Sequence, residues 1–196
     1  MTKRQKKQIF SLVIALIAAF ISLGQSHGWF GKTGEEVSKG VATSQSGLYT
    51  IKHFTDGDTI AVDMNGTTEN IRMIGIDTPE THKPNTPVQC YGPAAAAYTQ
   101  NRITATGNKV RLVSDNQSTD RDRYNRLLRY VYLTDGTNLD QELVANGYAF
   151  AYTSFPFTKS DDFVKAQKSA QDNKKGLWGN CTPVLESNGR WQSNNE

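Results

Sequence analysis

The chain has 196 residues, of which 37% are hydrophobic and 21% are charged. This composition is typical of a globular domain and excludes a disordered, collagen-like or polytopic membrane chain. The net charge of +3 arises at the N-terminus: without Lys3, Arg4, Lys6 and Lys7, 18 basic residues face 19 acidic ones. A protein that binds nucleic acid through overall positive charge is therefore excluded, and any such binding must use a local site.

The first residues in chain order have the character of a targeting segment. Fifteen apolar or small residues, 9–23, follow the basic cluster. Secretory signals have an apolar region of about 7–15 residues, whereas a membrane-spanning helix needs about 20. The length favours a signal peptide over residues 1–24, and an uncleaved N-terminal anchor or a buried core helix are the alternatives. With either a signal or an anchor, we expect a domain that is secreted or held outside the cytoplasmic membrane.

Composition divides the remainder of the chain into three parts. Residues 25–46 are rich in Gly, Ser, Thr and Lys, which predicts a flexible tether. Residues 47–182 are expected to fold as one domain, and residues 183–196 to form a polar tail.

The two cysteines, Cys90 and Cys181, are an even number in a chain expected to be exported. This number suggests a disulfide, with two free thiols as the alternative. A metal site is disfavoured because neither cysteine has a Cys or His neighbour at ligand spacing.

The first half of the domain reads mainly as strands. Apolar and polar residues alternate through the first two candidate strands, with the period of two that strands require. Asn65-Gly66 is a strong hairpin signal after the second of them. The five predicted strands cover residues 49–54, 59–64, 70–76, 109–114 and 126–133.

Three helices are expected. Residues 91–104 contain Pro93 and an alanine run, which are typical of a helix start and a helix interior. Asn138 is placed to cap a short helix, and residues 160–175 form a last helix with Gly176 just after its end. The order of elements predicts an α+β, mainly β fold: a five-stranded OB-type barrel with about three flanking helices.

Three segments concentrate residues suited to chemistry. Asp56-Gly57-Asp58-Thr59 offers hard oxygen ligands for Ca²⁺ or Mg²⁺, although Asp-Gly is also a common turn. The segment 71–80 contains an arginine in an apolar strand and ends in Asp-Thr-Pro-Glu. That arginine is either a snorkelling side chain or a guanidinium aimed at a phosphate. The segment 119–130 interleaves four arginines with tyrosine, as either a solvated loop or a phosphate-binding corner.

Together these segments are far more specific than any one alone. DGDT, R-x-x-x-x-D-T-P-E, YGPxA and D-x-Y-x-R occur in order over about residues 47–180, and GLWGNC follows at 176–181. This arrangement resembles the staphylococcal nuclease family. One departure is Ala94, where many members carry Glu after the YGP motif. This difference puts a structural contact of that Glu in doubt more than it does catalysis.

The resemblance implies a calcium site with one ion. Asp58, Asp77 and Thr78 match the family's ligands, Thr78 through its backbone carbonyl. Asp56 matches a residue close to the metal that does not bind it directly.

The resemblance also implies the catalytic groups. Arg72 and Arg126 match two arginines that hold the scissile phosphate, and Glu80 matches the general base. Tyr124 matches a tyrosine of the nucleotide pocket, and Tyr152 matches a second one less closely, because the spacing before it differs by about a residue.

The implied protein is an exported, calcium-dependent, non-specific nuclease that hydrolyses phosphodiester bonds of DNA and RNA and leaves 3′-phosphate ends. Its implied substrate is single-stranded nucleic acid or breathing duplex, and we expect a monomer that meets a membrane only through an uncleaved N-terminal segment. The first alternative is a non-catalytic nucleic-acid-binding OB-type module, in which catalytic residues are usually replaced. The second is a calcium-dependent adhesion domain, which leaves Arg72, Arg126 and Glu80 unexplained.

Overall fold

The computed structural model describes residues 47–81 and 87–195 of the chain. The expected signal peptide or anchor and the expected tether fall on residues 1–46, outside the described residues. The described residues form one compact unit. Within the described ranges, no helix has both the length and the apolar character needed to cross a membrane.

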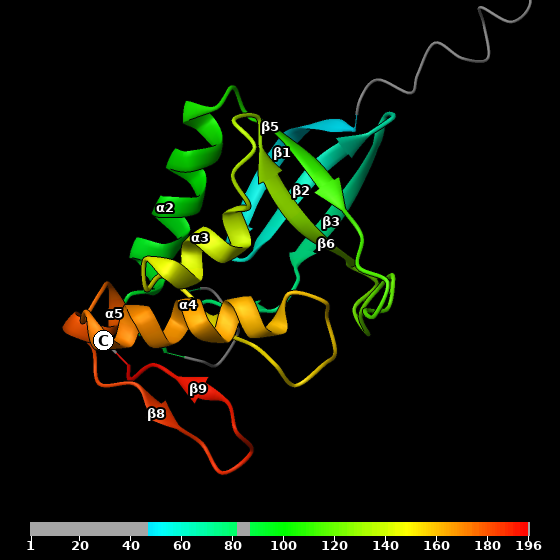
Figure 1. Cartoon of the computed structure of the whole chain (residues 1–196). Helices are drawn as coiled ribbons and strands as arrows, with labels where there is room; N and C mark the ends of the chain where they lie inside the picture. The colour runs from blue at the N-terminus through cyan, green and yellow to red at the C-terminus, as the bar shows by residue number, and fades with distance from the viewer. Residues whose placement is uncertain (1–46, 82–86, 196) are drawn as a thin grey trace, which may run out of the picture. The chain divides into compact units, whose positions relative to one another are not determined.

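Five strands form a closed barrel, as the sequence predicts (Figure 1). They follow the order β1-β2-β3-β6-β5, with β5 pairing back to β1. β3 and β6 run parallel, and the other neighbours run antiparallel. The strands are β1 (Leu48–Asp56), β2 (Thr59–Met64), β3 (Thr67–Met73), β5 (Lys109–Val113) and β6 (Leu127–Leu133).

The predicted third strand is interrupted at Gly75. β3 ends at Met73, and β4 (Ile76–Asp77) pairs instead with β7 (Phe150–Ala151) in a separate two-stranded sheet. Gly75 has φ of 74°, and a Cβ there would lie 2.5 Å from the Phe157 ring. Only glycine suits this turn, which redirects Asp77 away from the barrel strand.

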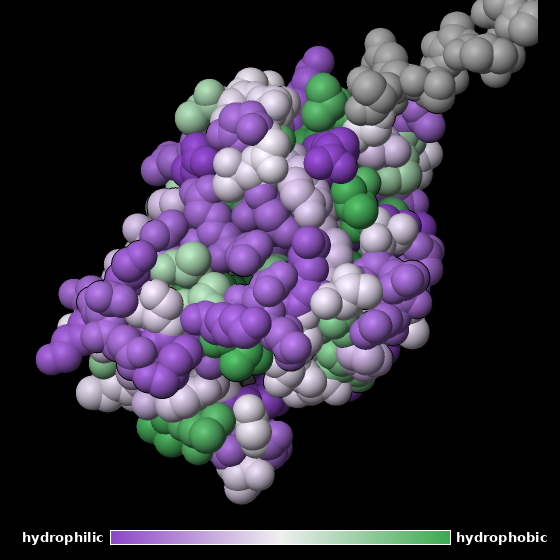
Figure 2. Space-filling view, viewed as in Figure 1, coloured by the Kyte–Doolittle hydropathy of each residue, from purple (hydrophilic) through white to green (hydrophobic). Residues whose placement is uncertain are grey.

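Side chains that alternate inward along the strands fill the barrel. Ile60, Val62, Ile71 and Val110 are fully buried there. Each contributes roughly 1.5–3 kcal/mol through removal of apolar surface from water. Figure 2 shows a mostly hydrophilic outer face on which hydrophobic residues form small, separate areas.

Helices cover one side of the barrel in Figure 1: α2 (Gly92–Ala105), α3 (Leu139–Ala145), α4 (Ser160–Asp172) and the short α5 (Leu177–Asn180). Pro93 stands in the first turn of α2, and the side chain of Asn138 accepts a hydrogen bond from Gln141 N at 3.1 Å to cap α3. Both helix starts agree with the sequence prediction.

The predicted end of the last helix is wrong. α4 stops at Asp172, and Lys174, with φ of 50°, takes the left-handed position that we expected at Gly176. Gly176 serves close packing instead, because a Cβ on it would lie 2.2 Å from the carbonyl oxygen of Gly147. Gly176 is therefore needed for the contact between two loops and does not mark the end of the helix.

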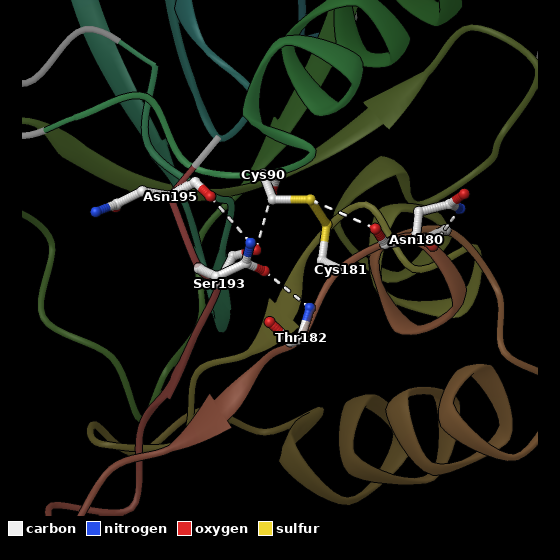
Figure 3. Close-up of a disulfide and its surroundings, with 8 residues drawn as sticks. Cys90, Asn180, Cys181, Thr182, Ser193 and Asn195 are labelled. Carbon is white, nitrogen blue, oxygen red and sulfur yellow. Dashed lines mark hydrogen bonds between the residues drawn. A yellow bond between two sulfur atoms is a disulfide. The ribbon is translucent and has the colours of Figure 1, made fainter.

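Residues after Thr182 form a hairpin. The sequence analysis predicts only a polar tail there. β8 (Val184–Leu185) pairs with β9 (Trp191–Gln192). The structure joins Cys90 and Cys181 by a disulfide, as predicted, at the point where this hairpin begins (Figure 3).

The far end of the hairpin is fastened beside the same disulfide. The hydroxyl of Ser193 donates to the Cys90 carbonyl at 2.9 Å, and Cys90 N donates to the Asn194 carbonyl at 2.7 Å (Figure 3). Trp191 packs edge-on against Trp178, with 5.0 Å between ring centroids. Both ends of the hairpin are thus tied to the domain.

Candidate active site

The DGDT turn links β1 to β2 and packs directly on the segment after β4. A Cβ on Gly57 would lie 2.9 Å from the Thr78 side chain, so only glycine allows this approach. Asp58 is buried, and its Oδ2 accepts a hydrogen bond from Thr78 N at 3.0 Å. The turn therefore brings together the two segments that the sequence singled out for metal binding.

Arg72 joins the two predicted metal-binding carboxylates. Its Nη2 lies 3.1 Å from Asp58 Oδ2 and 3.0 Å from Asp77 Oδ1. Burial disfavours the charge of Arg72, but the nearby acidic groups, with Asp58 and Asp77 the strongest, more than offset this, so the pKa of Arg72 is raised. Burial raises the pKa of Asp77, against the opposing effect of Arg72.

The carboxylate of Asp56 accepts hydrogen bonds from one backbone amide and one hydroxyl group. Its Oδ1 accepts hydrogen bonds from Gly57 N at 2.8 Å and Thr81 Oγ1 at 2.9 Å. Burial and repulsion from Asp58 raise the pKa of Asp56 to about 7. Asp56 thus braces the turn and the segment that carries Glu80.

Glu80 is fixed at its backbone by Gln89. Glu80 N donates to Gln89 Oε1 at 2.8 Å, and Gln89 N donates to the Glu80 carbonyl at 2.9 Å. The Glu80 carboxylate accepts from Thr81 N at 3.2 Å, and its proximity also contributes to the raised pKa of Asp56. The predicted general base therefore stands next to the acidic turn.

Arg126 reaches the same turn from the start of β6. Its Nε lies 2.7 Å from Asp122 Oδ2, and its Nη1 donates to Thr59 Oγ1 at 3.3 Å. Thr59 Oγ1 in turn donates to Asp58 Oδ1 at 2.9 Å. This chain of hydrogen bonds links the second predicted phosphate-binding arginine to the predicted metal ligand.

The two predicted nucleotide-pocket tyrosines differ in setting. Tyr124 is 65% exposed, and the guanidinium groups of Arg123 and Arg126 lie 4.8 and 5.4 Å from its ring centroid. Tyr152 N donates to the Gly75 carbonyl at 2.8 Å, which ties Tyr152 to the turn before Asp77. Arg190 lies over the Tyr152 ring, 4.9 Å from its centroid.

Sequence reasoning gave no role to two charged residues at the site. Asp122 is the first residue of the D-x-Y-x-R motif, and in the structure it orients Arg126. Arg190 contacts Asp77 from 113 residues away in sequence, and nothing local marks it.

The donor set fits a hard cation. In the described part of the chain, the buried Thr78 Oγ1 has no hydrogen-bond partner, and the backbone N of the same residue donates to the carboxylate of Asp58. No group of three or more His, Cys, Asp or Glu residues among 47–81 and 87–195 could hold a metal ion. Ca²⁺ takes six to eight oxygen ligands, so a site here would combine two carboxylates with backbone and water oxygens.

Comparison with known proteins agrees with this geometry. The family model for staphylococcal nuclease homologues matches residues 70–180. The thermonuclease of Staphylococcus hyicus is 41% identical over 176 residues, which cover 89% of this chain and 99% of that protein. The thermonuclease of Staphylococcus intermedius is 36% identical over 171 residues, covering 87% and 95%. Endonuclease YncB of Bacillus subtilis is 39% identical over 131 residues, covering 66% and 60%. The chain therefore belongs to the staphylococcal nuclease family and is a phosphodiester-hydrolysing nuclease.

Proposed function

We propose that this nuclease is exported, depends on one Ca²⁺ ion, and cuts DNA and RNA with little sequence preference, leaving 3′-phosphate ends. The observation that carries the proposal is the pair formed by buried Asp58 and partly buried Asp77, which Arg72 joins beside Thr78. Carboxylate and carbonyl oxygens in one small space suit Ca²⁺ better than a softer metal.

The site has the groups that phosphodiester hydrolysis requires. Water attacks phosphorus and the bond from phosphorus to O5′ breaks. The phosphate stays on O3′ of the preceding nucleotide, and O5′ leaves as a 5′-hydroxyl that takes its proton from solvent. When bound, Ca²⁺ would offset the negative charge of the phosphate. Arg72 and Arg126 donate to phosphate oxygens as charge builds on them, and Glu80 accepts the proton of the attacking water.

The proposed lack of sequence preference follows from the kind of contacts available. Arg72 and Arg126 are placed to meet phosphate, which is the same at every nucleotide. Tyr124 offers an exposed ring for base stacking, and stacking is tolerant of base identity.

Hydrolysis of single-stranded DNA by the full chain, in Ca²⁺ and in a chelator, tests this proposal. We expect Ca²⁺-dependent cutting, with Glu80→Gln lowering turnover by about 10²–10⁴ while the fold is kept. Glu69→Gln is the matched control, because Glu69 pairs at 2.9 Å with Arg121 in a partly exposed ion pair. Tight DNA binding by the folded protein without cutting in any divalent metal would instead favour a non-catalytic binding module.

Export is tested separately, because it depends on residues 9–23 and not on the active site. Expressed in a bacterial host, the chain should yield active nuclease in the medium if residues 1–24 are cleaved, or on the outer side of the cytoplasmic membrane if they stay. Nuclease confined to the cytoplasm would contradict the proposed export.

A further inference from the structure

Arg190, on the C-terminal hairpin, contacts the candidate active site. Its Nη2 lies 3.0 Å from Asp77 Oδ2, while Arg72 occupies Asp77 Oδ1 at the same distance. The guanidinium of Arg190 also lies over the ring of Tyr152, 4.9 Å from the ring centroid. A third arginine therefore stands between a predicted metal ligand and a predicted nucleotide-pocket tyrosine.

The position of Arg190 is set by the fold of the hairpin rather than by a loose tail. Arg190 N donates to Asn188 Oδ1 at 2.9 Å, and its carbonyl accepts from Glu186 N at 2.8 Å, so the hairpin turn orders the residue. The next residue, Trp191, packs on Trp178, and the Cys90–Cys181 disulfide fastens the hairpin base. The contact with Asp77 is built into the domain.

The side chain is nevertheless free enough to change partners. It is 44% exposed, whereas that of Arg72 is 13% exposed. A divalent cation bound by Asp77 would repel the Arg190 guanidinium and compete for the carboxylate oxygens. A phosphate held at the same place would attract the guanidinium, whose planar fork of donors matches phosphate oxygens.

We propose that Arg190 is a further substrate-binding residue of this nuclease, contacting a phosphate of the nucleic acid on the Tyr152 side of the Asp58–Asp77 pair. The inference rests on the proposed function, because that function puts the substrate phosphate at these aspartates. Arg190 leaves Asp77 when cation and substrate are bound and binds the strand, while Tyr152 supports its guanidinium. The hairpin is then part of the substrate cleft.

The test measures binding rather than cutting. In a Glu80→Gln background, a fluorescent single-stranded oligothymidylate is titrated with protein in Ca²⁺ at several salt concentrations. We expect Arg190→Ala to weaken binding by about tenfold and to lower the slope of log affinity against log salt by about 0.7, the value for one phosphate contact on a single strand. Arg190→Lys should keep most of the slope and lose part of the affinity.

Lys52→Ala is the matched control for the loss of one positive charge. Lys52 pairs at 3.1 Å with Asp63, which lies near the end of β2 and five residues after Asp58 in sequence. We expect Lys52→Ala to leave the salt slope unchanged.

The outcomes separate this inference from the proposed function. If the Glu80→Gln parent fails to bind the oligothymidylate in Ca²⁺, the proposed function fails and the inference falls with it. If the parent binds and Arg190→Ala binds equally well with the same slope, the inference alone is overturned. Tighter Ca²⁺ binding by Arg190→Ala in calorimetry, with DNA affinity unchanged, would also overturn it and identify Arg190 as an inhibitory contact on the metal ligand.

Discussion

At the residue scale, the active site consists of charges that hold one another in place. Asp58 accepts from Thr59 Oγ1 and Thr78 N, and both Asp58 and Asp77 pair with Arg72. A buried carboxylate is costly unless it is paired and hydrogen-bonded, so these contacts are what allow acids to be buried beside the barrel. The same contacts fix the carboxylates before any ligand arrives, which lowers the cost of organising the site on binding.

Asp115, away from the active site, is also a buried carboxylate held by hydrogen bonds, and its lowered pKa predicts how stability depends on pH. Burial alone would raise its pKa, but hydrogen bonds from Thr158, Tyr130 and Gln117 lower it from 3.8 to about 2. Because the folded-state pKa is the lower one, the stabilisation is complete above about pH 4 and is lost as the pH falls through about 2.

Asp115→Asn should lower the free energy of unfolding by about 2 kcal/mol at neutral pH, since one pKa unit is worth about 1.4 kcal/mol. It should also flatten the loss of stability on acidification, measured by urea unfolding at several pH values. Asp172→Asn, at an exposed carboxylate paired with Lys168, is the control. An Asp115→Asn curve parallel to that of the native chain would contradict the prediction.

The site residues that could be predicted are those inside local motifs. Asp58, Arg72, Asp77 and Glu80 lie within 23 residues of one another, and their types and spacing already suggest metal and phosphate chemistry. Arg190 lies 113 residues from Asp77, and its single positive charge in a polar segment carries no local signal. Contacts made only by the tertiary fold leave no pattern in the sequence around them.

At the element scale, two glycines show why local sequence patterns predict the positions of strands and helices better than their ends. Gly75 breaks a strand that hydrophobic periodicity predicts as continuous, because apolar residues stand on both sides of it. Gly176 looks like a helix end but is required by contact with Gly147, while Lys174 ends α4 in the left-handed region. Strand and helix positions follow from local preference, whereas their ends depend on packing partners.

The Cys90–Cys181 disulfide holds the β8–β9 hairpin to the domain. It joins residues 91 apart in sequence, and the chain-entropy model gives an upper value of about 4–5 kcal/mol for a loop of that size. The Cys90→Ser/Cys181→Ser double variant should lose about 2–5 kcal/mol in free energy of unfolding, measured by guanidinium denaturation.

Reductant supplies the control for this prediction. The native chain in reductant should match the double variant, and the double variant should not respond to reductant. Equal free energies for the native chain and the double variant under oxidising conditions would contradict a stabilising role for the Cys90–Cys181 bond.

At the scale of the whole molecule, barrel closure gathers the site from distant segments. The parallel pairing of β3 with β6 sets Arg72 opposite Leu128, two residues after Arg126. The DGDT turn then meets both arginines at one end of the barrel. Periodicity predicts the five strands but not this parallel pairing, since no local signal specifies partners far apart in sequence.

Asp58 and Asp77 are proposed to bind together the Ca²⁺ ion that cleavage requires. Calorimetric titration of the native chain with Ca²⁺, beside Asp77→Asn and the control Asp63→Asn, tests this proposal most directly. Asp63 lies at the far end of β2 and pairs with Lys52. We expect the native chain and Asp63→Asn each to bind one Ca²⁺ ion. In Asp77→Asn, the Ca²⁺ affinity should fall at least tenfold, and the rate of DNA hydrolysis should fall with it. Unchanged Ca²⁺ affinity in a folded Asp77→Asn protein would contradict the proposal.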